Sequence, residues 1–248
     1  MSSFGDGCLI AGSEDYPDGL RLERHDHDWG QLTFCISGVM QVVGDHAAWL
    51  SPPTRAIWLP AGVAHGIVMH GKVAARFLYL SPELAAPLSP IPQVLEVAPL
   101  LRELILHLLE IRTLHADIPA EARLAGLVVD LLLAARPLDL ALPLPRDRRA
   151  LMLAERLQEA PAQAASLAEL SSCAGASLRT LQRLFPIETG LTLEAWRQKA
   201  RLLHAVAQLS AGASVNVAAF DCGYESPSAF IAAFKRQFGV TPGRFSEG

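Results

Sequence analysis

The stretch VAAFDCGYESPSAFIAAFKRQFG, residues 217–239, decides the fold of the C-terminal part of this chain. A short helix is predicted to end at Gly223, because glycine tolerates the left-handed backbone of a turn. Ser226 then suits the N-cap of a second helix, and Pro227 suits its first position. Phenylalanines recur every four residues along this second helix, so one of its faces is expected to be buried. The pattern is typical of a helix-turn-helix motif.

The same plan occurs upstream in LAELSSCAGASLRTLQRLF, residues 167–185. A short helix ends near Gly175, and Ser177 caps the next helix, whose leucines and Phe185 point to a core. In such a motif the second helix can enter the major groove of DNA. Helices are predicted across this part of the chain, over Arg149–Glu159, Leu167–Ala174, Ser177–Phe185, Leu193–Leu209, Val215–Cys222 and Pro227–Phe238.

Over residues 150–246 the chain resembles the AraC/XylS family of transcription regulators. The resemblance rests on Leu181-x-x-Leu184-Phe185, Glu188-Thr189-Gly190, Arg201-x-x-x-Ala205, the stretch from Gly223 to Lys235, and the closing Phe238-Gly239-Val240-Thr241-Pro242. It implies a regulator that binds double-stranded DNA, with RNA polymerase as a further partner. It also implies an all-α DNA-binding domain with two helix-turn-helix motifs over residues 149–248.

The resemblance assigns base-reading positions to both motifs, namely Arg179, Gln182 and Arg183 in the first and Pro227, Ser228 and Ala232 in the second. Arginine can bond a guanine edge at two atoms, and glutamine can do the same with adenine. Proline, serine and alanine offer little beyond a hydroxyl group and apolar contact with thymine. We therefore expect the first motif to supply most of the base readout.

The second motif is expected to position the protein through phosphates. The candidate phosphate contacts are the helix N-termini at Ser177 and Ser226, together with Lys235 and Arg236. One departure from the family pattern is Pro186, which is followed by an isoleucine where basic or polar residues are usual. Proline is expected to end the first recognition helix early.

The N-terminal part reads as β-structure. Residues 20–80 alternate short apolar runs with turn clusters, which predicts the strands of a sandwich or barrel. Its motifs are Gly19, His25-Asp26-His27, Gln31, Gly38 and Pro60-Ala61-Gly62-Val63-Ala64-His65, and they resemble the two motifs of the cupin β-barrel. The predicted fold is α+β and multidomain: a cupin sensor barrel over 1–92, dimerisation helices, and the helical DNA-binding domain.

In metal-bearing cupins the matching positions hold a divalent metal, so the resemblance implies His25, His27, Gln31 and His65 as ligands. Three imidazoles with one oxygen ligand suit zinc, nickel, iron(II) or copper(II). Gln31 replaces the usual glutamate and Met69 a usual asparagine. The alternative is a degenerate cupin whose histidines line a ligand pocket or form local hydrogen bonds. The histidines that match no ligand spacing are His46, His70, His107, His115 and His204.

Five aromatic side chains could line an effector pocket in the barrel, although each could instead be barrel core: Trp29, Phe34, Trp49, Trp58 and Phe77. After Pro92 the apolar residues take a helical period, which predicts helices over Val94–His115 and Pro119–Arg136. These helices, in segment 93–136, could pack on the barrel or form a homodimer interface, and both can hold on different helix faces. Three prolines within 137–148 predict a stiff linker.

Charge is divided unevenly along the 248 residues, whose net charge is −4. Residues 146–248 hold 12 Lys and Arg against 9 Asp and Glu, whereas residues 1–145 hold 9 against 16. A basic half joined to an acidic half fits a DNA-binding module attached to a sensor. The chain shows no secretion signal and no membrane-length apolar run, and its cysteines, Cys8, Cys35, Cys173 and Cys222, form no close pair. We expect a soluble, cytoplasmic protein with reduced thiols and no membrane partner.

These features favour a transcription regulator whose barrel senses a small molecule or a divalent metal and thereby alters operator binding. One alternative is a metal-dependent cupin enzyme fused to a DNA-binding domain. Another is a constitutive regulator with an inert barrel. No further acid–base pair accompanies the histidines, so no enzymatic activity is expected.

Overall fold

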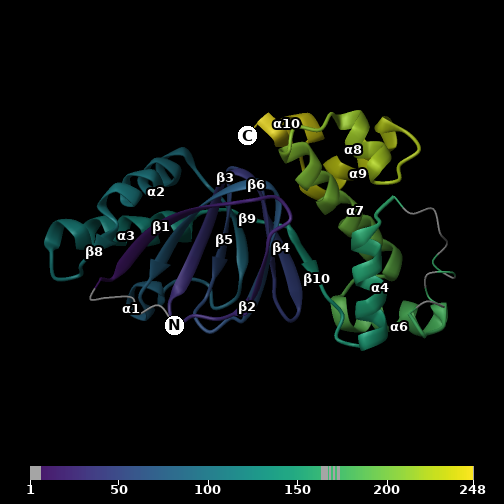
Figure 1. Ribbon diagram of the computed structural model, residues 1–248, viewed down its shortest axis with the longest axis horizontal. Helices are drawn as coiled ribbons and strands as arrows, with labels where there is room; N and C mark the ends of the chain where they lie inside the picture. Colours follow the sequence, from purple (N-terminus) through teal and green to yellow (C-terminus); the bar gives the residue numbers. More distant parts are fainter. Residues whose placement is uncertain (1–6, 163–166, 168, 170, 172–173, 248) are drawn as a thin grey trace. The chain divides into compact units, whose positions relative to one another are not determined.

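The computed structural model describes residues 7–162, 167, 169, 171 and 174–247, and it divides into two compact units (Figure 1). Unit 1 comprises residues 1–44 and 49–141 and is called the sensor unit after the role predicted for it from the sequence. Unit 2 comprises residues 45–48 and 142–248 and is called the DNA-binding unit for the same reason. The helix predicted over 167–174 lies largely outside the described residues, and Cys173 lies wholly outside them.

The sensor unit is built on one sheet, in which two long strands carry most of the pairing. The 14 residues of β3 and the 16 residues of β6 run antiparallel, with Leu32 opposite Leu78. The strands of the described residues are β1 (Leu9–Tyr16), β2 (Arg21–His25), β3 (Gly30–Val43), β4 (Ala47–Ser51), β5 (Arg55–Leu59), β6 (His65–Leu80), β7 (Gln93–Glu96), β8 (Thr113–Leu114), β9 (Pro137–Leu138) and β10 (Ala141–Pro143).

Gly38 shows why one motif glycine is needed. The β3–β6 register shifts on either side of Ser37, and Gly38 takes a φ of +70° there. A Cβ atom at Gly38 would lie 2.5 Å from the Lys72 carbonyl oxygen. Any other residue would therefore force the two strands apart.

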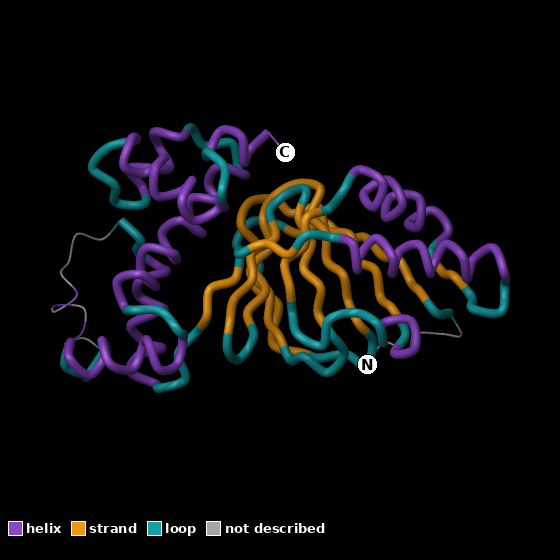
Figure 2. The backbone as a smooth tube through the Cα atoms, turned by 180° about the vertical axis from the view of Figure 1, so that it is seen from behind, coloured by secondary structure: helices purple, strands orange, loops and turns teal. Residues whose placement is uncertain are grey.

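Side chains alternate between the two faces of the sheet. One face, the helix-covered face, carries Leu32, Phe34, Trp58 and Leu78, which share a core with the helices behind them. These helices are α1 (Pro82–Ala85), α2 (Pro99–Ile111) and α3 (Pro119–Ala134), and Figure 2 shows α2 and α3 side by side along the strands. The opposite face carries Gln31, Thr33, Phe77 and Tyr79, the alternate residues of the same strands.

The helix predicted over Val94–His115 is wrong at both ends. Residues 93–96 form β7, paired with β5, and the helix starts only at Pro99. Val94 and Leu95 are both buried. A short run of consecutive apolar residues suits a strand that is buried on both faces. Hydrophobic periodicity alone cannot distinguish such a run from part of a buried helix.

The predicted linker over 137–148 contains regular structure. Its first residues form β9, which pairs with β7, and residues 141–143 form β10. Within the DNA-binding unit, the Leu144 amide donates to the His46 carbonyl oxygen at 2.8 Å. Glu188 accepts hydrogen bonds from the amides of Arg146 and Asp147 at 2.7 and 2.9 Å. The segment is therefore held along most of its length.

The DNA-binding unit is helical. Its described helices are α4 (Arg148–Glu159), α6 (Leu178–Thr189), α7 (Leu193–Ser210), α8 (Val215–Asp221), α9 (Pro227–Phe238) and α10 (Pro242–Glu247). Aromatic pairs fill its core, with Phe185 edge-on to Trp196 and Phe234 edge-on to Phe230. The Trp196 indole nitrogen donates to the Pro143 carbonyl oxygen at 2.5 Å. Among the described residues, no helix is long and apolar enough to cross a membrane.

Pro186 does not end α6, contrary to the prediction, because the helix continues to Thr189. Proline removes one helical hydrogen bond, but neighbouring contacts hold the last turn. Phe185 is fully buried, and Glu188 is bound to the backbone before α4. Gly190 then closes the helix in the left-handed conformation. These tertiary contacts outweigh the free-energy cost of a proline inside the helix.

Candidate nucleic-acid interface and effector site

Helix α6 divides cleanly into a buried and an exposed face. The Ser177 hydroxyl accepts from the Thr180 amide at 3.2 Å and so caps the helix. Leu181, Leu184 and Phe185 are buried in the core. The three predicted base-reading residues of the first motif, Arg179, Gln182 and Arg183, are all exposed. The exposed face therefore presents two guanidinium groups and one amide to the solvent.

Helix α9 has the same frame with different exposed chemistry. Ser226 accepts from the Ala229 amide at 3.3 Å, and Phe230, Ala233 and Phe234 are buried. The predicted base-reading residues are Pro227, which is half-buried, and Ser228 and Ala232, which are exposed. The predicted phosphate contacts Lys235 and Arg236 are exposed in the last turn.

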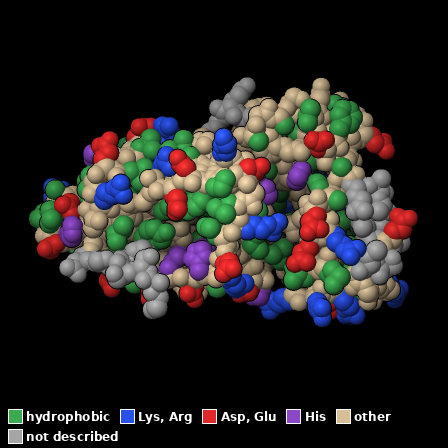
Figure 3. Space-filling view, viewed as in Figure 1, with side chains coloured by type: hydrophobic (Ala, Val, Ile, Leu, Met, Phe, Trp, Pro, Cys, Tyr) green, Lys and Arg blue, Asp and Glu red, His purple; other side chains and the backbone are tan. Residues whose placement is uncertain are grey.

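Cationic side chains are concentrated near the first motif. Figure 3 shows Lys and Arg side chains gathered at the end of the DNA-binding unit that carries α6. Helix α7 joins the two motifs and has 18 residues, so it is about 27 Å long. Helix α7 thus connects two motifs, and the second helix of each motif has an exposed face.

In the sensor unit, strand pairing brings the predicted metal ligands together. His25 of β2 lies opposite His65 of β6, and their ring centroids are 4.5 Å apart. The His27 ring lies 5.3 Å from His65 and 6.4 Å from His25. The side-chain amide oxygen of Gln31, the fourth predicted ligand, lies 2.6 Å from His27 Nε2 and can only accept from it. All four predicted residues thus lie in one cluster.

A backbone contact orients each of the three imidazole rings in the same way. Each Nδ1 lies within hydrogen-bond distance of a backbone carbonyl oxygen: His25 at 2.9 Å from Glu23, His27 at 2.5 Å from Trp29, and His65 at 2.7 Å from Val63. Because a carbonyl oxygen can only accept, this contact places a proton on Nδ1 and directs Nε2 away from the backbone. His65 Nε2 is buried and has no hydrogen-bond partner among the described residues.

Burial lowers the pKa of His65 to about 4, against the opposing effect of the Val63 carbonyl. The ring is therefore neutral near pH 7, as a metal-binding imidazole must be. As the side chains lie, no group of three or more His, Cys, Asp or Glu residues in the described part of the chain could hold a metal ion. The short contact with Gln31 occupies the Nε2 atom of His27.

A cavity of about 230 Å³ adjoins the cluster on the same face of the sheet. Its lining includes His25 and Gln31 and, among aromatic residues, Tyr16, Phe77 and Tyr79. The edge of the His27 ring meets Tyr79, and Gln31 donates to the Tyr79 hydroxyl at 3.4 Å. Sequence reasoning missed Tyr79 and Tyr16. Tyr79 is two residues after Phe77 on β6, so strand alternation could have found it.

The predicted effector-pocket aromatics do not lie together. Phe77 lines this cavity. Phe34 and Trp58 belong to the helix-covered core, which corrects their placement, because even-numbered residues of β3 point away from the Gln31 side. Trp49 of β4 is buried. Trp29 lines a different hollow, beside α1 and α3.

Several other histidines have local partners. His70 Nε2 lies 3.1 Å from Gln41, and His115 Nδ1 lies 2.9 Å from Glu121. Of the described cysteines, Cys8, Cys35 and Cys222 are free, and burial raises the pKa of Cys35 and Cys222 to about 12. These two thiols are unreactive at neutral pH.

The comparison with protein families decides the identity of the chain. Residues 7–138 match the family model described as "AraC-like ligand binding domain", and residues 170–248 match the model described as "Helix-turn-helix domain". The chain belongs to the AraC family of transcription regulators. This AraC-family protein therefore binds DNA through its helical unit, and its sheet-rich unit is a ligand-binding domain.

Two curated relatives agree with this assignment. The chain is 32% identical to the HTH-type transcriptional regulator NimR of Escherichia coli over 238 residues, which cover 96% of this chain and 85% of NimR. It is 38% identical to the HTH-type transcriptional regulator RipA of Corynebacterium glutamicum over 106 residues, which cover 43% of this chain and 32% of RipA.

Among solved structures, ToxT from Vibrio cholerae O395 matches with a TM-score of 0.42 and 10% identity. The match covers 97% of each chain.

Proposed function

We propose that this AraC-family regulator changes its operator binding when an effector occupies the histidine cluster and the cavity beside it. The observation that carries the proposal is the buried Nε2 atom of His65, which has no hydrogen-bond partner among the described residues and belongs to a ring 4.5 Å from that of His25 and 5.3 Å from that of His27. A buried polar atom without a partner costs free energy, so such an atom indicates a ligand. Gly38 and Gly62 have positive φ angles, which supports the predicted cupin fold.

We propose a divalent transition metal as the occupant of the cluster. The ligands would be the Nε2 atoms of His25, His27 and His65 together with the Gln31 amide oxygen, and the donor set suits zinc, nickel, iron(II) or copper(II). His27 Nε2 must lose its hydrogen bond to Gln31 to become a ligand. A bound metal would supply positive charge and open coordination positions for a small molecule. The Tyr16, Phe77 and Tyr79 side chains would contact the body of that molecule.

Metal analysis of the purified full-length chain tests this proposal. Protein prepared without chelating resins should contain about one equivalent of metal, and the His25→Ala/His65→Ala variant should contain none. His107→Ala is the matched control, because that imidazole is exposed on α2. Metal retained by the double variant would remove the cluster as the site. Operator affinity that never changes with metal or small molecules would favour a constitutive regulator.

We further propose that α6 reads bases and that α9 holds the backbone. The exposed face of α6 carries the side chains that can bond base edges, and that of α9 does not. We also propose homodimerisation through α2 and α3, which expose apolar side chains, among them Leu100 at 57% and Leu133 at 55%. Three further expectations stay predictions: the protein binds its effector without converting it, acts in the cytoplasm, and contacts RNA polymerase.

A further inference from the structure

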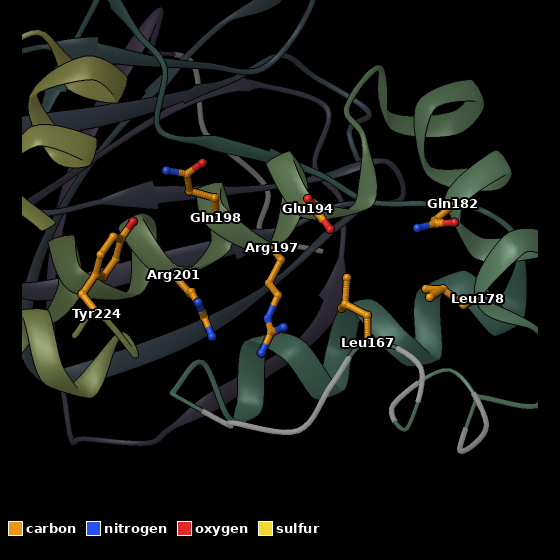
Figure 4. Close-up of a pocket in the computed structure, with 8 residues that line it drawn as sticks. All are labelled: Leu167, Leu178, Gln182, Glu194, Arg197, Gln198, Arg201 and Tyr224. Atoms are coloured by element: carbon orange, nitrogen blue, oxygen red, sulfur yellow. The ribbon is translucent and has the colours of Figure 1, made fainter. Parts of the chain in front are cut away.

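Charged side chains line hollows in both units, but with different signs. The hollow along α7 in the DNA-binding unit has Arg197, Arg201 and Glu194 in its lining, so both signs occur there (Figure 4). In the cavity beside the histidine cluster of the sensor unit, the acidic side chain of the described lining is Glu14. That described lining contains no Lys or Arg. The cavity is therefore negatively charged where Glu14 lines it.

Strand pairing places Glu14 at a distance from the histidine cluster. Gln31, which belongs to the cluster, lies opposite Tyr79 of β6. Glu14 of β1 lies opposite Ala75, four residues earlier on the same strand. At about 3.3 Å per residue, these two levels of the sheet are about 13 Å apart. The cluster and the carboxylate thus mark opposite ends of the cavity, and a cation bound at Glu14 would avoid the charge of a metal at the cluster.

An aromatic ring and a residue without a side chain lie between these two ends. Phe77 of β6 is opposite Gly12 of β1, and both line the cavity. A Cβ atom at Gly12 would have no atom of the described residues within 4 Å, its neighbours in the chain aside. The glycine therefore leaves room beside the Phe77 ring. The face of an aromatic ring attracts a cation.

Glu14 can accept further hydrogen bonds. The Tyr16 hydroxyl donates to Glu14 Oε2 at 2.8 Å, but a carboxylate has about four lone-pair sites. Arg76 pairs instead with Asp15, at 3.4 Å, and Asp15 points to the other face of β1 because side chains alternate along a strand. Burial and, after it, the hydrogen bond to Glu14 raise the pKa of Tyr16. Glu14 also adds to the burial that raises the pKa of Tyr79, so its charge acts on groups that line the cavity.

We propose that the cavity binds a small protonated amine with an aromatic or other apolar body. The ammonium group contacts the Glu14 carboxylate and the face of the Phe77 ring, and the body extends toward the histidine cluster. The cavity volume of about 230 Å³ is below the about 300–1,000 Å³ of pockets for drug-sized ligands, so the amine is small. The inference rests on the proposed function, because it names the chemical class of the effector in that cavity.

The test follows thermal unfolding of the full-length chain during titration with three probes of similar body. They are 2-phenylethylamine, which is protonated at neutral pH, 2-phenylethanol, which is neutral, and 3-phenylpropanoate, which is an anion. A ligand of the native state raises the unfolding temperature, so the shifts give apparent affinities. The wild type should bind the amine about two- to fivefold more tightly than the alcohol, and the anion least tightly.

Three variants locate the charge preference. Glu14→Gln should bind the amine and the alcohol equally, with the affinity for the alcohol unchanged. Asp15→Asn is the matched control, because it removes the neighbouring acid on the opposite face of β1, and it should keep the preference. Gly12→Leu fills the space beside Phe77 without a steric clash at Cβ and should weaken the binding of all three probes.

Equal wild-type affinities for amine and alcohol, or no shift with any probe, would overturn the inference. So would a preference that Glu14→Gln retains, or one that Asp15→Asn also loses, since the latter would show a general charge effect. Repeating the titrations with zinc, on the wild type and on His25→Ala/His65→Ala, separates this inference from the metal site. An amine preference without zinc binding would leave the inference standing and remove the metal. Zinc binding without the preference would overturn the inference alone.

Discussion

Helices α6 and α9 have the same frame but carry their cationic side chains at opposite ends. Each has 12 residues, a serine N-cap and a glycine C-cap in the left-handed conformation. Aligned from their caps, Phe185 matches Phe234 in the core, but Arg183 matches Ala232, and Pro186 matches Lys235. Helix α6 carries its cations in its first two turns, and α9 carries them in its last. The shared frame thus fixes where a side chain points, and the roles that we propose, base reading for α6 and phosphate contact for α9, rest on the exposed residues alone.

The largest expected effect tests the shared frame. Phe185→Ala and Phe234→Ala should each lower the free energy of unfolding by about 3–5 kcal/mol, because each leaves a cavity in an aromatic core. Chemical denaturation of the full-length chain measures both. Phe77→Leu in the sensor unit is a control that should not alter unfolding of the helical unit. A much smaller loss at one site would show that the two frames are not equivalent.

The next largest effect tests the exposed side chains of the two helices. Arg183→Ala should cost about 1–3 kcal/mol of binding on an operator defined by in vitro selection, and less on random DNA. Ser228→Ala on α9 should cost less on the same operator, because a hydroxyl discriminates bases weakly. Anisotropy titrations on both duplexes give the two differences. Equal losses of Arg183→Ala on operator and random DNA would assign Arg183 to phosphate.

A smaller effect compares the caps. Ser177→Ala and Ser226→Ala should each reduce stability by about 1 kcal/mol, since each removes the acceptor of one helix N–H group. Replacement by aspartate should restore the cap and serves as the control. Thermal unfolding is the measurement. If neither alanine variant changes stability, the capping hydrogen bonds contribute nothing measurable.

The smallest effect concerns the last turn of α9. Lys235→Gln should weaken binding to all duplexes alike and reduce the salt slope by about 0.9, as expected for one phosphate contact. Ile187→Lys places a cation in the last turn of α6, where the side chain is 70% exposed, and should steepen the slope by a similar amount, about 0.9. Lys235→Gln effects limited to the selected operator would contradict a phosphate contact by Lys235.

Local signals predicted the helical unit best. The cap and proline at Ser226 and Pro227 placed α9 over its observed residues, because these signals act within one turn. The sensor unit needed information that a single strand does not hold. Phe34 and Phe77 are both apolar residues of long strands, but only pairing shows that they lie on opposite faces of the sheet. Pro186 was misjudged for the same reason, since Glu188 and the buried Phe185 hold that turn from outside the helix.

The contacts of Trp196 and Glu188 also determine where the molecule can be cut. A DNA-binding fragment that begins at Arg149 would lack the Pro143 carbonyl oxygen that accepts from the Trp196 indole. It would also lack the Arg146 and Asp147 amides that bind Glu188 at the end of α6. Fragments for crystallisation or NMR should therefore begin at or before Leu142, and a protease that cleaves between Pro143 and Asp147 would loosen the recognition helix.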